Sequence, residues 1–130
     1  MVSAGQTATA TVTVTESNIA KTMKSGSLEV FATPAMSALM EEAAQAAVQP
    51  HLEEGEGTVG ISLSITHEAP TPLGAIVTAK ATVSAVEGRK ITFDIEASDG
   101  VGIIGHGTHE RFVINNEKFM AKVASRAKSN

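Results

Sequence analysis

The chain of 130 residues contains no cysteine, tryptophan or tyrosine, and only 3% of its residues are aromatic. Without cysteine it has neither a disulfide framework nor thiol chemistry, a composition that is compatible with a reducing compartment. No apolar run approaches the roughly 20 residues that a membrane-spanning helix needs. The polar start, MVSAGQTATA, lacks the charged and apolar regions of a signal peptide. We therefore expect a cytoplasmic protein with no membrane partner.

Positive charge is also scarce, since 10 lysines and arginines stand against 14 acidic residues and the formal net charge is -4. Nucleic-acid-binding domains carry a marked basic patch. Here the only basic cluster is diffuse and lies near the C-terminus: Lys118, Lys122, Arg126 and Lys128. We expect no nucleic-acid partner. The 42% of hydrophobic residues is instead typical of a globular protein, and we predict one domain over residues 1–130 with one core.

One long helix is predicted from the stretch VFATPAMSALMEEAA. Thr33 is a good N-cap, and Pro34 suits the first helical position because its missing N–H would have no partner there. Pro50 is expected to end the helix. Apolar residues recur three and four positions apart and form one stripe that can lie against a sheet: Met36, Leu39, Met40, Ala43 and Ala47.

Alternating residues predict five strands, over 6–15, 58–66, 75–86, 89–97 and 101–114, and a second helical pattern covers 117–128. In the second strand the predicted core-facing row is Val59, Ile61, Leu63 and Ile65. Mostly short turns join the last four strands, which implies antiparallel neighbours. One long helix cannot cover both faces of such a sheet. We therefore predict an α+β fold, with a five-stranded antiparallel sheet curled around the long helix, and an open edge strand that favours homodimers.

His67 follows Ile65 on the core-facing row of the second strand, where the pattern asks for an aliphatic side chain. Two interpretations remain open at this point. The histidine is either a hydrogen-bonded residue at the rim of the core, or a general acid or base held at a strand end beside a pocket.

Two carboxylates, Glu41 and Glu42, flank the apolar stripe of the long helix from opposite sides. Periodicity does not choose between them, and both can simply be solvated. Thr33 lies on the flank of Glu41, so a pocket shared with the start of the helix would contain Glu41. The helical rise separates these two residues by about 12 Å, so they would touch different parts of one ligand, or Glu41 would meet groups from elsewhere.

Glycines interrupt two of the predicted strands. Gly60 marks either a bulge or a place where a ligand approaches the backbone, and its N–H is then a candidate oxyanion donor. The glycines of VGIIGHGTHERF lack the strand-to-helix context of a phosphate-binding loop, and we attribute them to strand curvature. In the same segment His106 and His109 alternate to opposite faces, so we expect no metal site.

Four segments together resemble a known family: VFATPAM…LMEEAA, GEGTVGISLSITHEAPTPLG, VEGRKITFDIEASDGV and IGHGTHERFVI. In order and spacing, from about residue 29 to residue 122, they are similar to the hotdog-fold acyl-CoA thioesterases of the fluoroacetyl-CoA thioesterase-like family. The resemblance implies the hotdog fold and a homodimer with active sites at the subunit interface. It places the family's catalytic threonine, glutamate and histidine on Thr33, Glu41 and His67. Gly60 takes the place of the glycine whose amide is implicated with the thioester carbonyl.

The resemblance implies hydrolysis of a small acyl-CoA thioester without a cofactor. Glu41 would act as general base or as a nucleophile that forms an anhydride, and His67 would carry a proton to the leaving thiolate. Because coenzyme A carries phosphates, we also consider the basic residues Arg89, Lys90 and Arg111 as substrate-binding residues. The family's fluoroacetyl-selective enzyme has lid phenylalanines where this chain has Met23 to Ser27, so fluoroacyl selectivity is not implied. The alternatives are a non-catalytic acyl-CoA-binding dimer of the same fold and a hotdog dehydratase.

Overall fold

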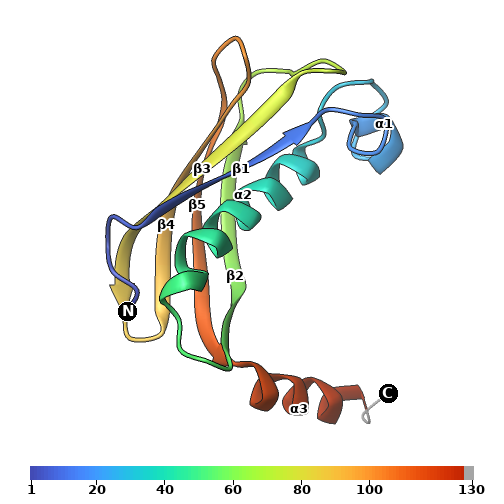
Figure 1. Ribbon diagram of the computed structural model, residues 1–130. Helices are drawn as coiled ribbons and strands as arrows, with labels where there is room; N and C mark the ends of the chain where they lie inside the picture. The colour runs from blue at the N-terminus through green and yellow to red at the C-terminus, as the bar shows by residue number, and fades with distance from the viewer. Residues whose placement is uncertain (128–130) are drawn as a thin grey trace.

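The computed structural model describes residues 1–127 (Figure 1). Its elements, in chain order, are β1 (Thr7–Thr13), α1 (Ala20–Met23), α2 (Thr33–Val48), the 3-10 turn η1 (Gln49–His51), β2 (Glu56–His67), β3 (Ile76–Glu87), β4 (Lys90–Ser98), β5 (Ile103–Asn115) and α3 (Asn116–Ala127). All five predicted strands and both predicted helices are present. The predicted end of the last helix, Lys128, lies outside the described residues.

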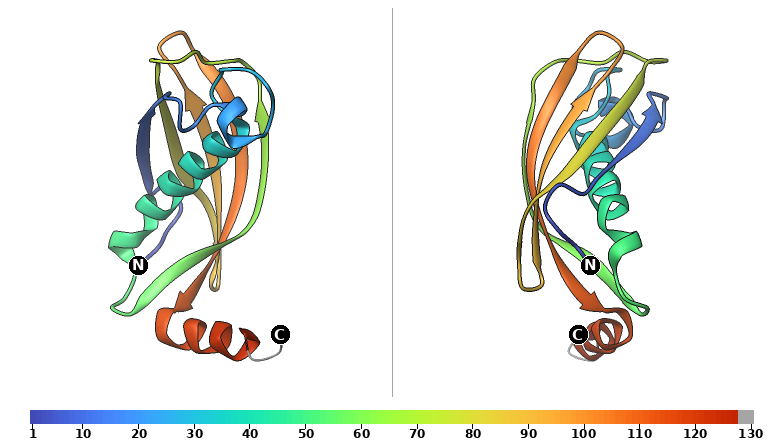
Figure 2. Two further views of the ribbon diagram at one scale, coloured as in Figure 1. Left: turned by 90° about the vertical axis from the view of Figure 1, so that its right-hand side faces the viewer. Right: turned by 60° about the vertical axis from the view of Figure 1, so that its left-hand side comes forward.

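The five strands form one antiparallel sheet in the order β1-β3-β4-β5-β2, so β1 and β2 are its two edges. The sheet curls around α2, which crosses its concave side (Figures 1 and 2). This confirms the predicted α+β architecture of a curled five-stranded sheet around one long helix. The short helix α1 lies at one end of the sheet, and α3 leaves the opposite end.

The core lies between α2 and the concave face of β3 and β4. Every residue of the predicted helix stripe is buried, as are the predicted inward rows of the two strands. These rows are Val77, Ala79, Ala81 and Val83 on β3, and Ile91, Phe93 and Ile95 on β4. The small side chains in the middle of β3 allow α2 to approach the sheet closely, because little volume separates the two backbones.

The predicted core-facing row of β2 is wrong in its first half. The register against β5 shifts between Gly60 and Ser62, and Ile61 is 51% exposed. Such a bulge reverses the alternation that precedes it. Gly60 lies opposite the buried Arg111, and Thr58 accepts a hydrogen bond from that same arginine. Thr58 and Gly60 therefore face α2, and Val59 between them faces outward.

Two glycines of β5 lie against methionine side chains of α2. A Cβ built on Gly105 would lie 2.5 Å from the carbonyl oxygen of Thr66 and 2.9 Å from the sulfur of Met36. A Cβ built on Gly107 would lie 3.3 Å from the sulfur of Met40. The strand thus carries glycine where the helix methionines need the space.

The C-terminal helix α3 buries none of its side chains. It begins where the Asn115 side-chain oxygen accepts a hydrogen bond from the backbone N–H of Lys118, at 3.0 Å. Of its predicted apolar edge, Phe119 is half-buried and Val123 is exposed. Within residues 1–127, no helix has the length and apolar character required to cross a membrane.

Candidate functional site

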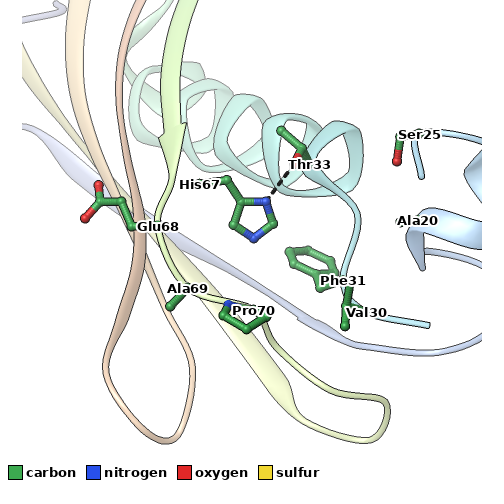
Figure 3. Close-up of a pocket in the computed structure, with 9 residues that line it drawn as sticks. All are labelled: Ala20, Ser25, Val30, Phe31, Thr33, His67, Glu68, Ala69 and Pro70. Carbon is green, nitrogen blue, oxygen red and sulfur yellow. Dashed lines mark hydrogen bonds between the residues drawn. The ribbon is translucent and has the colours of Figure 1, made fainter. Parts of the chain in front are cut away.

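The first residue of α2 carries a hydroxyl that is not used as a helix cap. The helix begins at Thr33, its N-cap is Ala32, and no side chain caps it, so the prediction that Thr33 is the N-cap is wrong. The Thr33 Oγ1 instead lies 2.7 Å from Nδ1 of His67 (Figure 3). Strand β2 ends at His67, which its alternation after the bulge turns toward the start of the helix.

The imidazole of His67 is partly buried, and this burial lowers its pKa because the charged form is desolvated. The ring is therefore neutral near pH 7. Its Nε2 is buried and has no hydrogen-bond partner among the described residues. If the Thr33 hydroxyl donates to Nδ1, then Nε2 carries the proton; if Nδ1–H donates to the hydroxyl, Nε2 has a free lone pair. Either way, Nε2 is placed to give or take a proton.

A cavity of about 280 Å³ adjoins this pair. It is lined by Ala20, Ser25, Val30, Phe31, Thr33, His67, Glu68, Ala69 and Pro70. Figure 3 shows the ring of His67 between the Thr33 hydroxyl and the ring of Phe31. Most of the other lining side chains are apolar, so a few polar groups converge in an apolar surround, as in small-molecule sites. Ser25 comes from the loop between α1 and α2.

A second polar cluster lies farther along α2. Arg111 Nη1 donates to Glu41 Oε2 at 3.2 Å, while its Nε and Nη2 donate to the hydroxyl and the carbonyl of Thr58 at 2.8 and 3.0 Å. Arg111 is only 6% exposed, which is low for an arginine. These hydrogen bonds fix the guanidinium, which in turn holds the Glu41 carboxylate at one position.

His109 completes this cluster, and we did not predict its role. Its Nδ1 lies 2.7 Å from the carbonyl oxygen of Ser62 and therefore donates to it, while its Nε2 accepts from Arg111 Nη1 at 3.2 Å. Burial, more than any neighbouring charge, lowers the pKa of His109. The ring is thus neutral, and its 3.7 Å approach to Glu41 is not an ion pair. The signal in the sequence is that His109 and Arg111 share a strand face with core residues.

Gly60 lies directly against the carboxylate of this cluster. A Cβ built on Gly60 would be 2.5 Å from Glu41 Oε2 and 3.2 Å from the ring of His109. Any side chain at position 60 would therefore displace this carboxylate. Glu42 is exposed on the other flank of the helix, where it borders a cavity beside β1. Of the two carboxylates, Glu41 is therefore the one that enters a polar site.

The structure thus gathers the predicted residues into two groups. Thr33 meets His67, and Glu41 meets Gly60 and Arg111. Within one chain the two groups do not meet, because eight residues of α2 separate them by about 12 Å along the axis.

His106 lies on the outer face of the sheet, opposite in direction to His109, as predicted. Its Nδ1 is 2.7 Å from Glu68 Oε2, and this carboxylate raises the pKa of His106. Within residues 1–127, no group of three or more histidine and acidic side chains is arranged to hold a metal ion.

The comparisons with known proteins decide which family this site belongs to. The family model described as fluoroacetyl-CoA-specific thioesterase matches residues 14–117. The chain is 53% identical over 95 residues to the fluoroacetyl-CoA thioesterase of Streptantibioticus cattleyicolor, a match that covers 73% of this chain and 68% of the relative. The chain belongs to the fluoroacetyl-CoA-specific thioesterase family.

Solved structures agree with this membership. A threonine-to-serine variant of the fluoroacetyl-CoA thioesterase in complex with acetyl-CoA superposes with a TM-score of 0.90, at 40% identity over 96% of this chain and 98% of the other. A hot-dog-like protein from Thermanaerovibrio acidaminovorans gives 0.86 at 27% identity, over 95% and 91% of the two chains. The hotdog fold expected from the sequence is confirmed.

Proposed function

We propose that this member of the fluoroacetyl-CoA-specific thioesterase family hydrolyses a small acyl-CoA thioester to the free acid and coenzyme A, with Thr33 and His67 at the reacting end of its site. The observation that carries this assignment is the buried Nε2 of His67, which has no partner among the described residues and belongs to a ring that lines the cavity. Buried nitrogen atoms without a hydrogen-bond partner are uncommon, and one beside a cavity indicates a ligand.

The substrate class is supported by the relatives. A family relative is described as a fluoroacetyl-CoA thioesterase, and a variant of such an enzyme has been solved with acetyl-CoA. A cavity of about 280 Å³ matches a small acyl group. The protein is an acyl-CoA thioesterase.

On the general-base route, Glu41 takes a proton from water, the water oxygen bonds to the acyl carbon and the C–S bond breaks; the neutral His67 accepts this proton and carries it to the thiolate. On the nucleophilic route, a Glu41 oxygen bonds to the acyl carbon as the C–S bond breaks, and water then cleaves the anhydride, which releases the acid and supplies the proton. Backbone N–H groups at the β2 bulge near Gly60 stabilise the charge that develops on the carbonyl oxygen. His67 passes a proton to the leaving thiolate, and the Thr33 hydroxyl fixes the ring that does so. Arg111 keeps the Glu41 carboxylate in place. We assign Arg111 to this positioning role, since its buried guanidinium is not free to reach the phosphates of coenzyme A.

The two groups of residues need a second copy of the chain to meet. Strand β2 is 12 residues long and its outer edge is unpaired within the described chain. If two β2 strands pair antiparallel around Ser64, with inward residues opposite inward residues, His67 lies opposite the Gly60 bulge of the partner subunit. That bulge adjoins Glu41. We propose a cytoplasmic homodimer in which His67 of one copy faces Glu41 of the other.

The direct test follows free thiol during incubation with acetyl-CoA and a panel of short acyl-CoAs. Thiol release above background that disappears in His67→Ala is the expected result. Binding of acyl-CoA without thiol release would show a non-catalytic binding protein of the same fold. Formation of an enoyl product from a hydroxyacyl-CoA would show a dehydratase.

A further inference from the structure

A cationic pocket at the far end of the molecule is not used by the chemistry above. It encloses about 310 Å³ and is lined by Arg89, Val113, Ile114, Asn115, Lys118, Phe119 and Lys122. Three of these side chains are cationic and none is acidic, in a protein whose formal net charge is -4. Such a local excess of positive charge recruits an anionic ligand.

The cations of this pocket are available to a ligand. Lys118 and Lys122 are one helical turn apart on α3, so their ammonium groups share a face of the helix. Both residues are exposed, and neither makes an ion pair within residues 1–127. Arg89 is partly engaged, since its Nη1 lies 3.7 Å from Glu56 and donates to the carbonyl of Val113. Phe119 adds an aromatic face beside these charges, and a base can stack on such a face.

We infer that this pocket binds the 3′-phosphorylated adenosine diphosphate of coenzyme A, and that it serves the active site of the partner subunit. The inference rests on the proposed function, which supplies the ligand: a purine ring and three phosphate groups at the end of the pantetheine arm opposite to the thioester. Two lysines and an arginine match the phosphates, and Phe119 matches the purine.

The assignment to the partner's site follows from the geometry of β2. Within one chain, the pocket adjoins the start of β2, because Glu56 pairs with Asn115, and His67 ends the same strand. The eleven steps from Glu56 to His67, at about 3.3 Å each, separate the two ends by roughly 36 Å. In the antiparallel pairing proposed above, His67 lies opposite the partner's Gly60, and the partner's Glu56 lies only four residues farther, or roughly 13 Å.

The helix that carries the pocket also points to a second copy. α3 projects from the sheet, buries no side chain and leaves Met120 and Val123 exposed (Figure 1). Its apolar side chains are thus available to a neighbouring subunit, which the pairing of the two β2 strands places beside it.

The nucleotide pocket is tested with Lys118→Ala/Lys122→Ala, using Lys80→Ala as a control that removes an exposed lysine from β3. Calorimetry with adenosine 3′,5′-bisphosphate should show an affinity loss on the order of 10-fold in the double variant, as expected from two exposed charge contacts. Its KM for acetyl-CoA should rise by a similar factor, while turnover of acetyl-pantetheine should not change. Unchanged affinity and KM in the double variant would overturn the assignment of this pocket to the nucleotide, even if the enzyme is active. Lysine-dependent nucleotide binding without any hydrolysis would support the pocket and reject the proposed function.

The placement across subunits is tested with heterodimers of His67→Ala and Lys118→Ala/Lys122→Ala, purified through two different tags. If the pocket serves the partner's site, one site per heterodimer contains both intact His67 and intact lysines. Acetyl-CoA hydrolysis should then recover the wild-type KM at about half the wild-type kcat. A heterodimer that keeps the high KM of the lysine variant, or a wild-type chain that is active as a monomer, would overturn this placement.

Discussion

At the scale of single residues, the site depends on two histidines that are both neutral for the same reason but have different partners. Burial lowers the pKa of His67 and of His109. His109 has both ring nitrogens occupied, by Ser62 and Arg111, whereas His67 has one nitrogen on Thr33 and the other without a partner in the described chain. A ring with a free nitrogen can exchange protons with a substrate, so His67 is the catalytic candidate and His109 supports Glu41.

The pH dependence of the reaction should report this lowered pKa. A histidine whose pKa is lowered below 6.5 stays neutral down to lower pH, so kcat/KM should fall only as the pH drops below 6.5. For stability the sign is the same, since protonation favours the unfolded chain and the free energy of unfolding should decrease below pH 6.5. A kcat/KM profile with acetyl-CoA between pH 4.5 and 8, on the order of ten points, measures the midpoint. His106→Gln is the control, because the pKa of His106 is raised; an acid limb centred above 6.5 would contradict the assignment.

Substitution of each of the two neighbouring glutamates tests whether Glu41 is the carboxylate that takes part in the reaction. Glu41→Gln removes the negative charge that Arg111 holds beside Gly60, so we expect a loss of at least about 100-fold in kcat. Glu42→Gln alters an exposed side chain on the other flank of α2 and should change kcat little. Steady-state kinetics of the two variants measure the difference. Equal activities of the two variants would show that Glu41 is the wrong carboxylate or that the reaction follows a different chemistry.

At the scale of elements, the sequence predicts burial best where one hydrophobic period continues through a whole helix or strand. The stripe of α2 and the inward rows of β3 and β4 are buried as their periods predict. In β2 a single extra residue at Ile61 reverses the alternation, and a one-residue bulge leaves no mark in a two-residue repeat. Glycine at position 60 indicated that a bulge or a close approach occurs, but it did not indicate which neighbours approach.

In the site too, the sequence indicated the individual residues but not the contacts between residues that are far apart in the chain. Its four central residues were found from local patterns and from the family resemblance. The contact of Arg111 with Glu41 joins positions 70 residues apart, and the contact of Thr33 with His67 joins positions 34 apart. Contacts of this kind depend on the curl of the sheet around α2. For this reason the roles of His109 and Arg111 could not be read from the chain alone.

The bulge in β2 should be sensitive to one added methyl group. In Gly60→Ala the new Cβ would lie 2.5 Å from Glu41 Oε2, so either the carboxylate or the strand must move. Because displacement of one oxyanion donor costs on the order of 100-fold, we expect a comparable loss of kcat/KM. Gly102→Ala is the matched control, since a Cβ there meets nothing within 4 Å. Circular dichroism separates this effect from unfolding. Full activity of folded Gly60→Ala would exclude a role for this close approach.

At the scale of the whole molecule, one chain holds two groups of candidate site residues at different points along α2. The free edge of β2 and the uncovered face of α3 lie on the parts of the chain that adjoin these groups. A single association through β2 would cover the edge, bring His67 to the partner's Gly60 and place the cationic pocket near the substrate. In the proposed dimer, catalysis and assembly are linked, because a separated subunit lacks a complete site.

A charged residue at the centre of the β2 edge should therefore weaken the dimer and its activity without unfolding the subunit. In Ser64→Lys, two lysines meet across the proposed two-fold axis, and such like-charge contacts cost several kcal/mol at an interface. We expect the dimer to weaken at least about tenfold and kcat/KM to fall with the fraction of monomer, while the melting curve of the subunit persists. Light scattering coupled to size exclusion, with activity measured on the same samples, follows both quantities. Thr13→Lys places the same charge on an exposed position of the other edge strand, β1, and should leave the dimer and its activity unchanged. A monomeric Ser64→Lys with full activity would show that one chain contains a complete site, and an intact dimer would show that the subunits meet elsewhere.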